Sequence, residues 1–119
     1  MHVLASIGLA TKMNKTERRY ADRLELLQFN GDVASWQFEE LKLRLANGCW
    51  YTPDFVVVLH DLRIEMIDVK AGLPTGKPLC KDDALVKIKC AAQQHPYRFV
   101  MTWEHQGRWV ERVFGDDHD

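Results

Sequence analysis

The chain lacks the residue patterns that mark zinc proteins and disulfide-stapled domains. Its three cysteines are odd in number and stand far apart, and none belongs to a CxxC pair or to a Cys/His set with zinc spacing. The five histidines form no HExxH or HxxxH arrangement. The sequence therefore predicts neither a structural zinc nor a disulfide framework.

Long hydrophobic runs are also absent. No apolar segment approaches the roughly 20 residues that are needed to span a bilayer. The short apolar run at 3–10 is preceded only by Met1 and His2, so we do not expect a signal peptide. We therefore expect a protein without membrane association that is located in the cytoplasm.

The chain has no excess of charge of one sign. Its 16 lysines and arginines nearly balance its 17 aspartates and glutamates, and the formal net charge is −1. Charged residues make up 28% of the chain and hydrophobic residues 46%, values typical of globular proteins. At 119 residues the chain is expected to form one domain, with a core over about 12–114 and terminal segments at 1–11 and 115–119.

The balanced total conceals two basic segments. Residues 12–23 and residues 70–89 each carry five lysines or arginines and only two acids. Such segregation of charge could steer a polyanion to one face of the protein. The alternative is that both segments are ordinary solvated helix faces.

Hydrophobic periodicity predicts two helices, over residues 14–29 and 82–94. In the first strand that follows, alternation places Ala34, Trp36 and Phe38 on one face. The pattern indicates an α/β or α+β sheet flanked by helices. Strands are expected at 33–40, 41–45, 55–59, 63–69, 97–103 and 108–114, and a loop at 71–81.

The two strands at 55–59 and 63–69 form a predicted hairpin. If residues 60–62 are its loop, Asp54 falls opposite Asp68, and Lys70 lies on the same face of the sheet. Opposed side chains lie roughly 4.5–5.5 Å apart at Cβ, so two carboxylates there repel each other. A hard divalent cation such as Mg²⁺ between them would remove the repulsion.

A plainer interpretation of the hairpin stays open. Proline is tolerated where a strand begins, so Pro53-Asp54 could be a simple strand start. Asp68 and Lys70 could then be the solvated end of an edge strand.

Glu17 is a third carboxylate with two roles. It fits a capping box with Asn14 at the start of the first helix. It also continues the apolar stripe of Tyr20, Leu24 and Leu27, so it is expected to point toward the sheet. A carboxylate there is unfavourable unless it is paired or near a cation.

With Glu17, Pro53-Asp54 and Asp68-Val69-Lys70 in place, the sequence resembles the PD-(D/E)xK superfamily of nucleases, which have the restriction-endonuclease-like fold. Asp68 stands where most of that family has glutamate. The segments that resemble its small phage-borne endonucleases and Holliday-junction resolvases are NKTERRYADRLELL, YTPDFVVV, IDVKAG and DDALVKIKCAAQQHPYRFVM.

The resemblance implies a central mixed β-sheet in the order α-β-β-β-β-α-β-β and a Mg²⁺- or Mn²⁺-dependent endonuclease that hydrolyses DNA. It implies Glu17, Asp54, Asp68 and Lys70 as catalytic residues, and Asp54, Asp68, the carbonyl of Val69 and Glu17 as metal ligands. The residues that it suggests for DNA binding are Arg18, Arg19, Lys77, Lys81 and Lys87.

The same resemblance leaves several functions open. The chain could act on branched DNA during phage or mobile-element DNA processing, in the cytoplasm of a host cell, alone or as a homodimer. Alternatively, it could be a nuclease-fold DNA-binding or assembly subunit that is inactive without a partner, as part of a larger phage or transposition complex. An RNA substrate is also left open.

Overall fold

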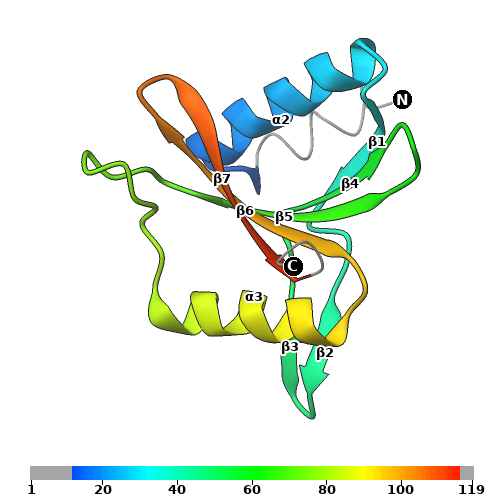
Figure 1. The fold of residues 1–119 in the computed structure, drawn as a ribbon, viewed down its shortest axis with the longest axis vertical. Coiled ribbons are helices and arrows are strands. Elements are labelled where there is room, and N and C mark those ends of the chain that lie inside the picture. The colour runs from blue at the N-terminus through cyan, green and yellow to red at the C-terminus, as the bar shows by residue number, and fades with distance from the viewer. Residues whose placement is uncertain (1–11, 116–119) are drawn as a thin grey trace.

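A mixed five-stranded sheet with one helix on each face forms the protein, and a small β-hairpin lies beside the second helix (Figure 1). The structure is a computed structural model that describes residues 12–115. The elements are α2 (Lys15–Phe29), β1 (Val33–Phe38), β2 (Leu43–Ala46), β3 (Cys49–Tyr51), β4 (Phe55–Leu59), β5 (Ile64–Lys70), α3 (Asp82–Gln94), β6 (Arg98–His105) and β7 (Arg108–Gly115).

The predicted α/β class and the mixed sheet flanked by helices are confirmed. The element order differs by one short strand, β3, which pairs with β2 in a separate two-stranded sheet. The apolar run at 3–10 and the acidic residues 116–119 lie outside the described residues. Within residues 12–115, no helix is both long and apolar enough to cross a membrane.

The sheet has the strand order β1-β4-β5-β6-β7. Only β5 and β6 are parallel, and α3 connects them, so these three elements form a βαβ unit. Because β4 and β6 flank β5 on either side, β5 is a central strand. The interpretation of Asp68 and Lys70 as the solvated end of an edge strand is therefore wrong.

The hairpin of β4 and β5 has the predicted register. Phe55 pairs with Ile67 and Val58 with Ile64. The Leu59 N–H donates to the Arg63 carbonyl at 2.9 Å, so residues 60–62 form the loop. Leu62 closes this loop in the left-handed region, with φ 72°.

The core has two parts, one on each face of the sheet. Under α2, Phe55 is fully buried and its ring contacts those of Tyr20, Trp36 and Phe38. Under α3, a second cluster includes Ile88, Ala91, Phe99 and Met101, all at most 1% exposed. These two clusters hold the central strands between them.

The prediction that Ala34 shares a face with Trp36 and Phe38 is wrong. Ala34 is exposed, and Val33 takes its place in the cluster under α2. A β-bulge between Val33 and Ser35 inserts an extra residue, which shifts the alternation before Trp36 and Phe38.

Candidate metal and phosphate site

Two carboxylates meet at one end of the β4–β5 hairpin. Asp54 immediately precedes the Phe55–Ile67 pair and Asp68 immediately follows it, as the register requires. Asp68 is only 6% exposed, and the side chains of the two aspartates are hydrogen-bonded to each other. The Val69 N–H donates to Oδ2 of Asp54 at 2.8 Å, which fixes the carboxyl group against β5.

This environment favours a protonated Asp54. Burial, together with the negative charge of Asp68, raises the pKa of Asp54 to about 9. Near neutral pH Asp54 is therefore protonated in the metal-free protein. A divalent cation bound at the pair would displace that proton, so binding should strengthen as the pH rises.

Two lysines line the cavity that contains the acidic pair. The Nζ of Lys70 lies 3.4 Å from Oδ2 of Asp68, and its side chain is 22% exposed. Lys87, which projects from α3, lines the same cavity as Asp54, Asp68 and Lys70. The site therefore combines carboxylate acceptors with ammonium donors, a set suited to a cation together with an anionic ligand.

Two further carboxylates, those of Glu17 and Glu39, lie near Asp54. Carboxylate oxygens of Glu17, Glu39 and Asp54 lie within 4.8 Å of one another. Glu17 is 9% exposed and also makes the predicted capping box, in which its Oε1 accepts from the Asn14 N–H at 3.0 Å. Both roles expected of Glu17, the helix cap and the inward position, are present.

Glu39 was not predicted. It follows β1 with a left-handed backbone, φ 51°, and its N–H donates to the Asp54 carbonyl at 2.9 Å. The pairing of Phe38 with Phe55 brings it to Asp54. The signal that could have revealed it is the pairing of β1 with β4.

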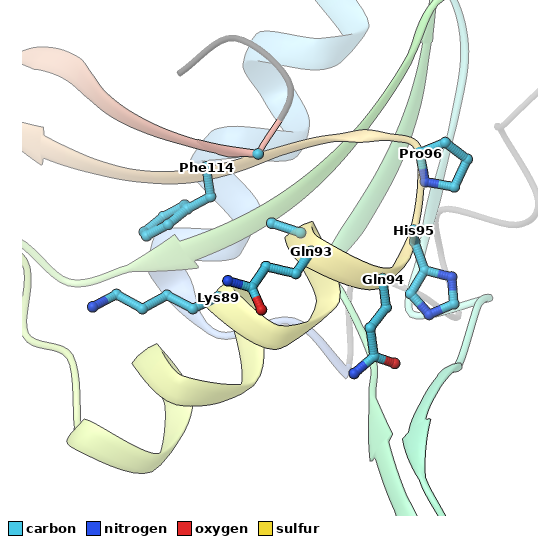
Figure 2. Close-up of a pocket in the computed structure, with 8 residues that line it drawn as sticks. Lys89, Gln93, Gln94, His95, Pro96 and Phe114 are labelled. Atoms are coloured by element: carbon cyan, nitrogen blue, oxygen red, sulfur yellow. The ribbon is translucent and has the colours of Figure 1, made fainter. Parts of the chain in front are cut away.

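The acidic pair opens into a cavity of about 340 Å³ between β3, the hairpin and α3. Its lining residues are Trp50, Tyr51, Thr52, Asp54, Asp68, Lys70, Ala84 and Lys87. A larger cavity of about 620 Å³, between the end of α3 and the end of β7, has Lys89, Gln93 and His95 in its wall (Figure 2). Among the described residues, 12–115, none that lines this larger cavity has a carboxylate, so the smaller one is taken as the candidate site.

The predicted DNA contacts are dispersed over the surface. Of the five, Lys87 alone lines the cavity with the acids. Arg18 and Arg19 lie on α2, where Arg19 is paired with Glu104 of β6 at 2.7 Å. The exposed Lys77 lies in the loop before α3, and the exposed Lys81 caps that helix.

The donor set fits a hard divalent cation. Such ions take oxygen ligands, and Mg²⁺ is often held by only one or two carboxylates. Asp54 and Asp68 provide the carboxylates, and Glu17 is near Asp54. The carbonyl of Val69 was predicted to be a metal ligand. In the structure the Val69 N–H donates to Asp54, and the Val69 side chain is buried under α2.

Replacing Asp54 by asparagine is expected to stabilise the metal-free protein at pH 8 by roughly 1–2 kcal/mol. The folded protein keeps a proton on Asp54 up to about pH 9, whereas the unfolded chain releases it near 3.8. Wild-type stability therefore falls as the pH rises between these values, because the folded state binds the extra proton. Asn has no such proton, and it retains an oxygen for the Val69 N–H.

Urea unfolding in EDTA at pH 5 and pH 8 tests this expectation. The difference between the proteins should be larger at pH 8, and added Mn²⁺ should stabilise the wild type more than Asp54→Asn. A variant that is less stable than the wild type at pH 8 would contradict the predicted protonation of Asp54.

No protein-family model matches this chain, and comparison with curated proteins and with solved structures finds no significant match. Its function is therefore argued from the site itself.

Proposed function

We propose that this protein is a metal-dependent endonuclease that hydrolyses phosphodiester bonds in DNA, with a restriction-endonuclease-like fold of the PD-(D/E)xK type. The observation that carries the proposal is the hydrogen-bonded pair of the half-buried Asp54 and the buried Asp68, with Lys70 Nζ 3.4 Å from Asp68. The pair and both lysines line one cavity. Carboxylates can bind a divalent cation, and neighbouring lysines can bind the phosphate anion. This combination of groups is suited to phosphoryl transfer chemistry.

Asp54, Asp68, the Val69 carbonyl and Glu17 would hold Mg²⁺ or Mn²⁺. When bound, the ion would acidify a water molecule and stabilise the charge that develops on the phosphate. Lys70 would position the attacking water and offset the phosphate charge, because its ammonium group lies beside Asp68 and the residue lines the cavity. Lys87 would contact a phosphate oxygen from α3.

The basic segments support a polyanionic substrate. Lys15, Arg18 and Arg23 are exposed on α2, and Lys77 and Lys81 are exposed around the start of α3. Such side chains would contact the DNA backbone without reading its sequence. They would set the position of the strand relative to the cavity.

Cleavage by the purified chain tests the proposal. Supercoiled plasmid and a synthetic four-way junction are incubated with Mg²⁺, Mn²⁺ or EDTA. We expect cleavage with either metal and none with EDTA. If the chain binds DNA but does not cleave it under any of these conditions, the function as a partner-dependent subunit would be favoured instead.

Lys87 and Lys89 offer a matched pair of substitutions. Both are exposed lysines on α3, but Lys87 lines the acidic cavity and Lys89 the larger one. Lys87→Ala is expected to lower kcat/KM for cleavage about 10- to 100-fold, because it removes a charge-assisted phosphate contact. Lys89→Ala should change it less than about threefold. Equal effects would show that Lys87 acts only through general charge.

A further inference from the structure

Tyr51 is buried in the wall of the candidate site with its hydroxyl group unused. The residue is 5% exposed, and its ring packs against Phe99 with the centroids 6.3 Å apart. Within residues 12–115, its hydroxyl is the one fully buried side-chain oxygen or nitrogen that lacks a hydrogen-bond partner. Buried polar groups are rarely left unpaired in native proteins, so this one calls for a ligand.

The position of Tyr51 identifies which ligand. It lines the cavity that also contains Asp54, Asp68, Lys70 and Lys87. Burial and the neighbouring charge of Asp68 raise the pKa of the Tyr51 hydroxyl, so it remains a neutral donor at physiological pH. The donor-bearing residues of the wall are Trp50, Tyr51, Thr52, Lys70 and Lys87, and of these Tyr51 has the buried hydroxyl without a partner.

A ligand that accepts from the Tyr51 hydroxyl and from both lysines must carry several acceptor oxygens. A water molecule would satisfy the hydroxyl alone, but it would fill little of the roughly 340 Å³ cavity and would use neither lysine as a donor to an anion. A phosphate group has enough oxygens for the hydroxyl and the lysines, and the acids can share it through a cation.

We propose that the Tyr51 hydroxyl donates a hydrogen bond to a non-bridging oxygen of the phosphate that occupies this cavity. The inference rests on the proposed function, which supplies the phosphodiester substrate. It adds a neutral donor that the carboxylate and lysine motif does not include.

Tyr51→Phe tests this, since it removes only the hydroxyl. Tyr97→Phe is the matched control, because the Tyr97 ring packs against the same Phe99, with centroids 6.5 Å apart, but Tyr97 does not line this cavity. Inorganic phosphate is titrated into each protein at constant ionic strength and followed by amide chemical shifts. The urea stability of each protein without ligand and its DNA cleavage are measured in parallel.

We expect wild type and Tyr97→Phe to bind phosphate alike, with shifts around the cavity, and Tyr51→Phe to bind it about 5- to 10-fold more weakly. Tyr51→Phe should be at least as stable as wild type without ligand, because it loses an unpaired buried hydroxyl. Its kcat/KM should fall by a similar factor.

Three results would overturn the inference. They are equal phosphate binding by Tyr51→Phe and wild type, no binding by wild type at the cavity, and a marked loss of stability in Tyr51→Phe. The last would show that the hydroxyl has an internal structural partner. Because phosphate binding is measured without cleavage, failure of this inference is distinct from failure of the endonuclease function, which the metal-dependent cleavage assay decides.

Discussion

Asp68→Asn is expected to reduce DNA cleavage by roughly 1,000-fold or more while the protein stays folded. Asp68 is 6% exposed and lies between Asp54 and Lys70, with a hydrogen bond to the first and an ion pair to the second. Asparagine keeps the size of the side chain but removes the charge that would hold a cation. Loss of that charge removes the cation and the orientation of Lys70 together.

Initial cleavage rates across a range of Mn²⁺ concentrations measure this effect. Asp61→Asn is the matched control, because Asp61 is an exposed aspartate in the loop at the opposite end of the same hairpin. The Asp61→Asn variant should cleave DNA at the wild-type rate. Lys70→Ala should lose activity to a similar degree without weakening Mn²⁺ binding. Activity of Asp68→Asn within tenfold of wild type would exclude the pair as the centre of the chemistry.

Phe55→Ala is expected to lower the free energy of unfolding by about 3–5 kcal/mol. Phe55 is 0% exposed, and its ring contacts three other aromatic rings with centroids 5.2–5.7 Å away. Truncation leaves a cavity between α2 and the sheet that these large rings cannot collapse to fill. A single domain commonly has only about 5–15 kcal/mol of stability, so this is a large share of the total.

Urea unfolding followed by circular dichroism measures the loss. Phe29→Ala, at a phenylalanine that is 88% exposed at the end of α2, should change stability by less than about 0.5 kcal/mol. A loss below about 1 kcal/mol for Phe55→Ala would contradict a tightly packed cluster. Because Phe55 adjoins Asp54, the same variant should also weaken phosphate binding.

Local patterns predicted the parts of the molecule that depend on near neighbours. The β4–β5 register followed from the three-residue loop, and it placed Asp54 against Asp68. The α3 bounds, Asp82–Gln94, match the predicted helix because a His-Pro pair ends it. The two roles of Glu17 could be predicted because both the capping box and the helical spacing depend on residues within one turn.

Other features depend on contacts between distant segments. Glu39 reaches Asp54 only because β1 pairs with β4, which hydrophobic alternation does not reveal. Tyr51 joins the site because the β2–β3 hairpin packs against α3 rather than extending the main sheet. The face of Ala34 was predicted wrongly because a β-bulge adds one residue to β1, and the hydrophobic alternation of the sequence does not reveal this bulge.

The connection between β5 and β6 also bears on the order in which the protein folds. The β4–β5 hairpin closes over residues 60–62 alone, so it can form early and bring the two aspartates together. The pairing of Glu65 with Arg98 must wait for the intervening loop and α3 to be ordered, a much longer closure. We therefore expect the acidic pair to be assembled by a fast local event, and Lys87 to join the same cavity only in the slower step that completes the sheet.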